Sequence, residues 1–183
     1  MKKYILFFLL LLIVPVSYKL YRIYQHQNDL KEAKELSIGK SVPNIELVTN
    51  SGKKILLRNQ KGKIIVVEFW ASWCKYCLAE IPQINSFYKG IKDNPDIEFI
   101  SIAIDEDIKD AQKIIESKGI KYPVAYDKKL SNGSWKYMDK FRVVGVPSIW
   151  VIDKRGKIVA LNLQTIKEAK RVISSLDSKG GSN

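Results

Sequence analysis

Residues 64–77 read IIVVEFWASWCKYC, an apolar run that ends in two cysteines three residues apart. The segment from Ile64 to Trp70 predicts a strand that is buried on both faces, as in the middle of a parallel sheet. At the start of a following helix, Cys74 and Cys77 share one face and lie close enough for a disulfide. Free backbone N–H groups and the helix dipole favour a thiolate on the first cysteine. The pair therefore predicts a reversible redox site.

These are the only two cysteines among 183 residues, and His26 is the only histidine. A structural zinc site needs about four ligands, so Cys and His side chains cannot supply one here. A structural disulfide and two inert thiols are the alternatives. The position of the pair, directly after a strand and at a helix start, favours redox chemistry.

Hydrophobic periodicity on both sides of this run predicts alternating strands and helices. The predicted strands are 45–49, 54–57, 97–104, 122–126, 148–152 and 157–161, and the predicted helices are 78–91, 108–119, 134–141 and 165–176. Pro82 is expected to kink the first helix. The third helix is expected to bury Trp135, Met138 and Phe141.

This order of elements predicts an α/β fold with a mixed central sheet flanked by helices, and with a hairpin before and after it. Thr165 and Glu168 form a capping box for the last helix. The cysteine pair comes at the C-terminal end of a central strand, where ligands and catalytic groups gather in open α/β sheets.

The N-terminal segment differs from the rest of the chain. Lys2 and Lys3 precede the apolar run from Tyr4 to Val16, a pattern that predicts a membrane-spanning signal anchor over residues 1–24. Removal after Ser17 is the alternative. Residues 25–38 predict a polar stalk, 39–177 the folded domain and 178–183 a disordered tail. We therefore expect a domain that is anchored to the membrane and faces the extracytoplasmic side.

The formal net charge of the chain is +12. The basic residues are scattered along the sequence without an arginine-rich run, so the pattern does not indicate nucleic-acid binding. We expect a solvated, lysine-rich surface with some attraction to an anionic membrane face.

Two carboxylates lie close to the cysteines in the sequence. Glu68 interrupts the apolar strand six residues before Cys74. If it points inward, burial raises its pKa, and it can take and return the proton of the inner thiol; if it points outward, it is a solvated edge residue. Glu80 follows Cys77 by three residues and is either a second group of this kind or a surface charge.

Several motifs together resemble a known family. They are the segment from Phe69 to Cys77, Glu80-Ile81-Pro82, the segment from Val144 to Ser148, and Val151-Ile152-Asp153-Lys154-x-Gly156. The pattern is similar to that of the thioredoxin superfamily and, within it, to the membrane-anchored TlpA/ResA-type thiol-disulfide oxidoreductases. The resemblance covers about Gly39 to Leu176. It implies a thioredoxin-like fold with a central βα insertion within Ile97–Lys140.

The resemblance also implies roles for individual residues. Cys74 would be the exposed attacking thiol and Cys77 the buried resolving thiol. Glu68 and Glu80 would both act on these thiols. The substrate-binding residues would be Trp73, Lys75, Tyr76, Val146 and Pro147. Pro147 would be cis, although an X-Pro bond taken from the sequence alone is expected to be trans.

The function implied by the resemblance is exchange of disulfides with protein substrates, as a reductase and within cytochrome c maturation. It implies no cofactor or metal, and a thiol-transferring membrane protein as electron donor. A disulfide-donating oxidase and a metallochaperone for copper-site assembly are the alternatives. A peroxiredoxin would need Pro-x-x-x-Thr-x-x-Cys, which is absent before Cys74. The dipeptide Lys75-Tyr76 departs from the family, where a proline is common between the cysteines.

Overall fold

The computed structural model describes residues 14–21 and 38–180. The chain divides into two units, Met1–Ser37 and Ile38–Asn183. In the first unit, residues 14–21 are helical. No helix within the described residues is long and apolar enough to cross a membrane. Most of the predicted anchor and stalk lies outside the described residues, as do residues 181–183.

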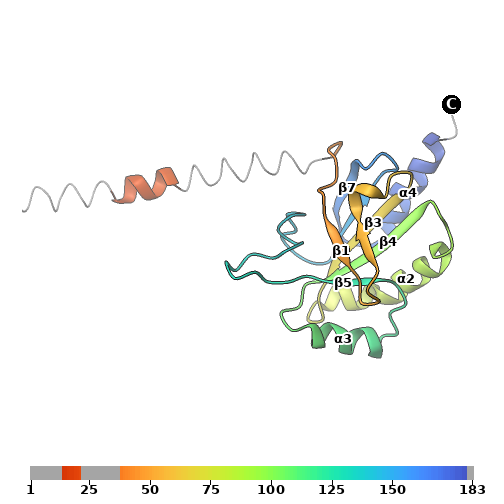
Figure 1. Cartoon of the computed structure of the whole chain (residues 1–183), viewed down its shortest axis with the longest axis horizontal. Helices are drawn as coiled ribbons and strands as arrows, with labels where there is room; N and C mark the ends of the chain where they lie inside the picture. Colours follow the sequence, from red (N-terminus) through yellow and green to blue (C-terminus); the bar gives the residue numbers. More distant parts are fainter. Residues whose placement is uncertain (1–13, 22–37, 181–183) are drawn as a thin grey trace, which may run out of the picture. The chain divides into compact units, whose positions relative to one another are not determined.

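The second unit contains one five-stranded mixed sheet and a separate two-stranded hairpin (Figure 1). Its elements are β1 (Glu46–Val48), β2 (Lys54–Leu56), the 3-10 helix η1 (Leu57–Asn59), β3 (Ile64–Trp70), α2 (Lys75–Ile91), β4 (Ile97–Ala103), α3 (Ile108–Ser117), β5 (Val124–Tyr126), β6 (Ser148–Ile152), β7 (Ile158–Leu163) and α4 (Ile166–Gly180). The sheet order is β5-β4-β3-β6-β7, with β3 parallel to β4 and antiparallel to β6. All seven residues of β3 are buried, as its apolar run predicts.

The helices gather on one face of this sheet. The chain crosses from β3 to β4 and from β4 to β5 in the same direction, so right-handed crossovers place α2 and α3 on the same side. Phe87 and Tyr88 of α2 pack on Phe99 of β4, with ring centroids 5.9 and 6.3 Å apart. Because α4 packs on α2 as well as on β6 and β7, it belongs to this face too.

The sequence predicts a sheet flanked by helices, but the opposite face of the sheet is covered by other segments. Phe69 and Trp150 both contact the ring of Phe141, with centroids 5.1 and 5.2 Å apart. The hydroxyl of the buried Tyr137 donates to the Glu46 carbonyl of β1 at 3.0 Å. Among the described residues, this face is therefore packed by the segment between β5 and β6 and by the β1–β2 hairpin, not by a helix.

The predicted helix over 134–141 is wrong. This segment forms turns, and Tyr137 is buried with Phe141, whereas Trp135 and Met138 are only half-buried. The cause is Asp127, which is buried and accepts backbone N–H bonds from Tyr137 at 2.8 Å and from Met138 at 2.7 Å. A carboxylate that takes backbone donors in this way stabilises a turn at the expense of a helix.

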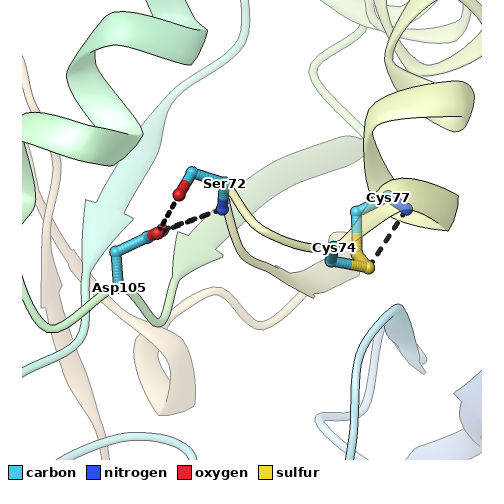
Figure 2. The surroundings of a disulfide bond; sticks show 4 residues. All are labelled: Ser72, Cys74, Cys77 and Asp105. Atoms are coloured by element: carbon cyan, nitrogen blue, oxygen red, sulfur yellow. Dashed lines mark hydrogen bonds between the residues drawn. A yellow bond between two sulfur atoms is a disulfide. The ribbon is translucent and has the colours of Figure 1, made fainter.

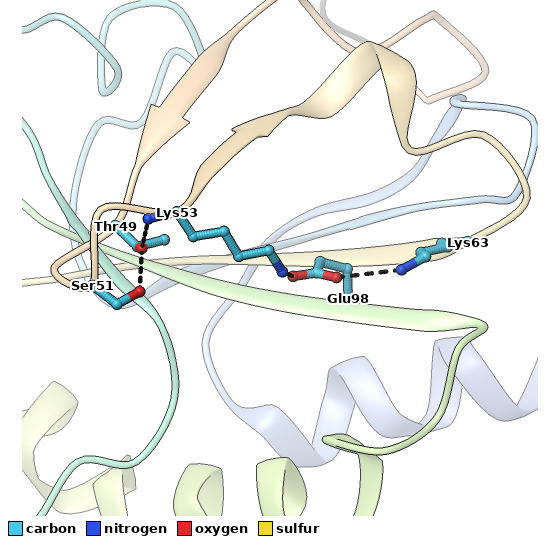
Figure 3. A network of polar contacts seen from close by, with 5 residues as sticks. All are labelled: Thr49, Ser51, Lys53, Lys63 and Glu98. Atoms are coloured by element: carbon cyan, nitrogen blue, oxygen red, sulfur yellow. Dashed lines mark hydrogen bonds and ion pairs between the residues drawn. The ribbon is translucent and has the colours of Figure 1, made fainter.

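The N-terminal hairpin forms around Asn50-Ser51-Gly52 as predicted. Figure 3 shows the contacts that hold its tip. The Thr49 hydroxyl pairs with Ser51 and accepts the Lys53 N–H, while the Lys53 ammonium lies 2.9 Å from Glu98 of β4. Lys63 approaches the same carboxylate at 3.6 Å. This network ties the hairpin to the sheet just where β3 begins.

The last helix begins with the predicted capping box. The Glu168 carboxylate accepts the Thr165 N–H at 3.1 Å, and the Thr165 hydroxyl accepts the Glu168 N–H at 3.3 Å. The helix continues to Gly180, into the segment that the sequence predicts as a disordered tail. In α2, Pro82 lies within the helix, which runs on to Ile91.

Candidate active site

The two cysteines form a disulfide at the N-terminus of α2. Their sulfurs are 2.13 Å apart, and their Cα atoms are 5.2 Å apart. Cys74 is the N-cap residue, and its Sγ accepts the backbone N–H of Cys77 at 3.2 Å (Figure 2). A sulfur in this position faces the free donors and the positive end of the helix dipole. The site therefore favours a thiolate on Cys74 when the disulfide opens.

The expected difference in exposure between the two cysteines is small in this oxidised state. Cys74 is 4 % exposed and Cys77 is 1 % exposed. Cys74 is therefore not the exposed residue that the resemblance implies. The reason is that its Sγ is bonded to Cys77 Sγ and turned toward the first turn of the helix.

The side chains around the disulfide are exposed and largely apolar. Trp73 is 69 % exposed and Tyr76 is 76 % exposed, and Lys75 between the cysteines is also exposed. Tyr and Trp side chains are enriched at protein interfaces. The three residues form an exposed, largely aromatic rim beside the disulfide.

A second segment reaches the same edge of the sheet. Ser148 of β6 pairs with Phe69 of β3, so the preceding residues lie beside the end of β3, where the chain turns toward the cysteines. The Val146–Pro147 bond is cis, as the resemblance implies and contrary to the reading from the sequence alone. Pro147 is buried and Val146 is half-buried, while Val144 is 93 % exposed.

Glu68 is buried, and its placement follows from the register. Side chains two residues apart in a strand share a face, so Glu68 lies on the same side as Val66, which pairs with Phe99 under α2. The buried residues Cys77, Ile81 and Ile84 of α2 face this side of the sheet. Glu68 therefore lies between β3 and the helix that carries the cysteines.

Burial raises the pKa of the Glu68 carboxyl to about 8; the Ser101 hydroxyl lowers it, and the negative charge of Glu80 raises it. Oε2 of Glu68 has no hydrogen-bond partner among the described residues. The negative charge of Glu68 also contributes to a raised pKa of the largely buried Tyr122. At neutral pH Glu68 is mostly protonated, so it can give a proton or take one close to pH 7.

Glu80 has a position that neither sequence reading anticipated. It is half-buried, and its Oε2 accepts the backbone N–H of Ile166, the first residue of α4, at 3.1 Å. Its charge acts on Glu68 from the same helix that carries Cys77. Glu80 thus joins the cysteine helix to the start of α4 and also couples electrostatically to the buried carboxyl.

An aspartate that sequence reasoning missed holds the loop before the cysteines. Asp105, two residues after the end of β4, is buried and accepts both the backbone N–H and the hydroxyl of Ser72 (Figure 2). The sequence carries one signal that points to it: a carboxylate follows a predicted buried strand next to the strand that leads to Cys74. The two residues are 33 positions apart, so their contact depends on the pairing of β3 with β4.

Comparisons with known proteins agree with a redox function for this disulfide. The sequence pattern of the AhpC/TSA family matches residues 38–161. The chain belongs to the AhpC/TSA family. The ResA thiol-disulfide oxidoreductase of Bacillus thuringiensis is 34% identical over 151 residues, which cover 82% of this chain and 81% of the relative. The ResA protein of Bacillus subtilis is 29% identical over 162 residues, which cover 88% of this chain and 84% of the relative.

The fold is shared with solved structures of this type. The thioredoxin domain of a thiol-disulfide oxidoreductase from Bacteroides vulgatus superposes with a TM-score of 0.65 at 26% identity, covering 76% of this chain and 98% of that one. This AhpC/TSA-family protein is thus a thioredoxin-like thiol-disulfide oxidoreductase of the ResA type, and Cys74 and Cys77 are its Cys-x-x-Cys pair. The predicted resemblance is confirmed.

Asp105 offers a test of how this oxidoreductase holds its active-site loop. Replacing Asp105 by alanine removes the partner of the backbone N–H and the hydroxyl of the half-buried Ser72, so we expect the free energy of unfolding of the oxidised protein to fall by about 2 kcal/mol. Asp105→Asn keeps one acceptor oxygen and should lose about half as much. Denaturant unfolding measures both. Equal stability of the wild type and both variants would show that the contact with Ser72 does not support the loop.

Proposed function

We propose that this protein reduces disulfides in other proteins on the extracytoplasmic side of a membrane, to which residues 1–24 anchor it. One observation carries the proposal: the Cys74–Cys77 disulfide caps the N-terminus of α2, with the Cys77 N–H directed at Cys74 Sγ. This geometry stabilises the thiolate of Cys74 in the reduced protein. The exposed Trp73 and Tyr76 beside it supply a surface for a polypeptide substrate.

In the first step, the Cys74 thiolate attacks one sulfur of a substrate disulfide. A bond forms between Cys74 Sγ and that sulfur, the substrate S–S bond breaks, and the second substrate sulfur leaves as a thiolate that takes a proton from water. The extended substrate lies along the segment that ends in Val146 and cis-Pro147, which shares the sheet edge with the cysteines.

In the second step, Cys77 resolves the mixed disulfide. The small fraction of Glu68 that is ionised takes the proton of the Cys77 thiol, because its raised pKa makes it a base close to neutral pH. The Cys77 thiolate attacks Cys74 Sγ, the Cys74–Cys77 bond forms, the bond between Cys74 and the substrate breaks, and the substrate sulfur that was bound to Cys74 leaves as a thiolate. The substrate gains two electrons, and the cysteine pair of the oxidoreductase loses two.

The oxidised pair must then be reduced again for a further cycle. A thiol-transferring membrane protein is the proposed electron donor, because a domain anchored by residues 1–24 stays near the membrane. The proposed clients have paired cysteines, as in the maturation of c-type cytochromes. Glu80 is proposed to modulate the resolving step through its charge on Glu68.

The midpoint potential of the Cys74/Cys77 pair tests the direction of electron flow. We expect a value near that of thioredoxin, about −270 mV, together with reduction of insulin disulfides when a dithiol regenerates the protein. Equilibration with thiol–disulfide buffers of known potential gives the number. A potential close to that of strong oxidants, about −120 mV, would assign the protein as a disulfide donor and overturn the reductase proposal.

A further inference from the structure

The cations of the chain are not spread evenly over the folded domain. Two hollows of about 870 and 600 Å³ lie along the C-terminal two-thirds of α2 and share Ser86. The first lies between α2 and α4, and the second lies between α2 and the segment before β5. Six basic residues line the two hollows: Lys89, Lys92, Lys121, Lys167, Lys170 and Arg171. We call the surface formed by these six residues the α2 basic face.

Little negative charge opposes this face. No acidic residue lines either hollow. At its border, Lys92 lies 3.1 Å from Asp93, and Arg171 interacts with Glu168. The half-buried Glu80 also lies at the border, where it accepts the backbone N–H of the first residue of α4. Within the part of the chain that the structure describes, the other four lysines form no ion pair. The face therefore keeps a strong positive potential, although no stretch of the sequence is densely basic.

The chemistry of the lining suits phosphate. Five of the six cations are lysines, which bind phosphate as point charges, and the guanidinium of Arg171 can bind phosphate through two N–H groups. Ser86, Ser174 and Gln83 add neutral donors around the cations. The floor holds the half-buried ring of Phe87, an apolar group suited to the boundary between headgroups and acyl chains.

The shape of the face indicates a broad ligand. Cations from α2, from α4 and from the segment before β5 stand on both sides of one exposed helix surface. A single phosphate would engage one hollow, whereas a layer of headgroups engages both. We propose that the α2 basic face binds the anionic phospholipid headgroups of the membrane. The proposal deepens the proposed function, because it rests on an anchor that keeps the domain near a bilayer.

This contact would leave the redox site accessible. The disulfide caps the N-terminal end of α2, whereas the hollows begin at Pro82 and extend toward its C-terminal end. A domain that binds headgroups along this part of α2 therefore keeps Trp73 and Tyr76 available to a protein substrate. Lipid contact orients the domain and does not take part in disulfide exchange.

Lysine labelling of the full-length chain in lipid nanodiscs tests the proposal. One set of nanodiscs contains phosphatidylcholine alone, and the other also contains phosphatidylglycerol. Acetylation of Lys89, Lys121, Lys167 and Lys170, followed by mass spectrometry, should be at least about threefold slower on the anionic discs, and high salt should remove the protection. Lys109 near the start of α3 and Lys140 in the segment between β5 and β6 are exposed and serve as internal references, whose labelling should not change.

Two matched variants distinguish an effect of the α2 basic face from an effect of the net charge of the protein. Lys167→Gln/Lys170→Gln/Arg171→Gln should lose the protection of Lys89 and Lys121. Lys61→Gln/Lys109→Gln/Lys140→Gln removes the same charge from exposed positions elsewhere and should retain it. Equal labelling of the face on neutral and anionic discs would overturn the lipid proposal. Protection that appears only after polyglutamate is added would assign the face to an acidic protein and would overturn it as well.

Association with the discs reports on the anchor independently. If the chain joins neutral discs but its lysines are not protected on anionic discs, the anchor is supported and the proposed lipid contact is overturned. A chain that joins only anionic discs, with the face protected, has the lipid contact without an anchor. If the chain joins neither kind of disc, both the membrane anchor and the lipid contact are overturned.

Discussion

Replacing Cys77 by serine should convert the protein into a trap for its substrates. Cys74 can still attack a substrate disulfide, but no second sulfur is left to resolve the mixed disulfide. We expect steady-state reduction of insulin to fall by at least about 1000-fold, while a covalent adduct accumulates. The adduct is visible on non-reducing gels and by intact mass, and it should disappear when a dithiol is added.

Cys74→Ser is the matched control for this variant. The N-cap position directs the Cys77 N–H at Cys74 Sγ, so the thiolate that starts the reaction belongs to Cys74. Cys74→Ser should therefore be as inactive as Cys77→Ser, but without an adduct. An adduct on Cys74→Ser and none on Cys77→Ser would reverse the assignment of attacking and resolving cysteines. It would also show that the helix terminus does not decide which sulfur reacts.

Replacing Glu68 by glutamine should remove much of the pH dependence of stability. Burial raises the pKa of this carboxyl from 4.5 to about 8 in the folded protein. Between these two values the folded state holds a proton that the unfolded chain releases. The contribution of this carboxyl to stability is therefore fully present below about pH 4.5 and is lost as the pH rises to about 8. At about 1.4 kcal/mol per pKa unit, the loss amounts to about 5 kcal/mol.

Glu68→Gln keeps the size of the side chain and stays neutral at every pH. Denaturant unfolding of the oxidised proteins at pH 5 and pH 8.5 should show the decline in the wild type and little of it in the variant. Glu80→Gln removes a negative charge that raises the pKa of Glu68, so it should shift the decline to lower pH. If wild type and Glu68→Gln lose the same stability between these pH values, the carboxyl does not titrate in this range.

The same substitution should also slow the resolving step. Without a base next to Cys77, release of the substrate from the mixed disulfide should be about 100-fold slower at pH 7. In Glu68→Gln, its rate should instead rise with the concentration of hydroxide, which replaces the carboxylate as the base. Rapid mixing of the reduced protein with a fluorescent disulfide peptide separates this step from the initial attack, which Glu68→Gln should change little.

Much of this architecture can be predicted from neighbouring residues alone. The apolar run from Ile64 to Trp70 predicts a fully buried strand, and the spacing of the cysteines predicts a disulfide at a helix start; both are observed. The burial of Glu68 follows from its place inside that run. These predictions succeed because strand period, helix period and capping act over a few residues.

Other features depend on partners far away in the chain. Periodicity predicts a helix over 134–141, but Asp127 takes the backbone donors of Tyr137 and Met138 and holds the segment in turns. Asp105 reaches Ser72 only because β4 pairs with β3. Glu80 accepts the N–H of Ile166 at the start of α4, although the two residues are 86 positions apart. No local pattern contains these pairings.

The basic residues show the same division. By itself, the sequence determined the net charge of +12, the redox pair and the strand that carries it. Only the tertiary structure decided that lysines scattered between positions 89 and 170 share one face along α2. Secondary structure follows from interactions within a few residues, whereas a surface is assembled by the packing of helices and strands that lie far apart in the chain.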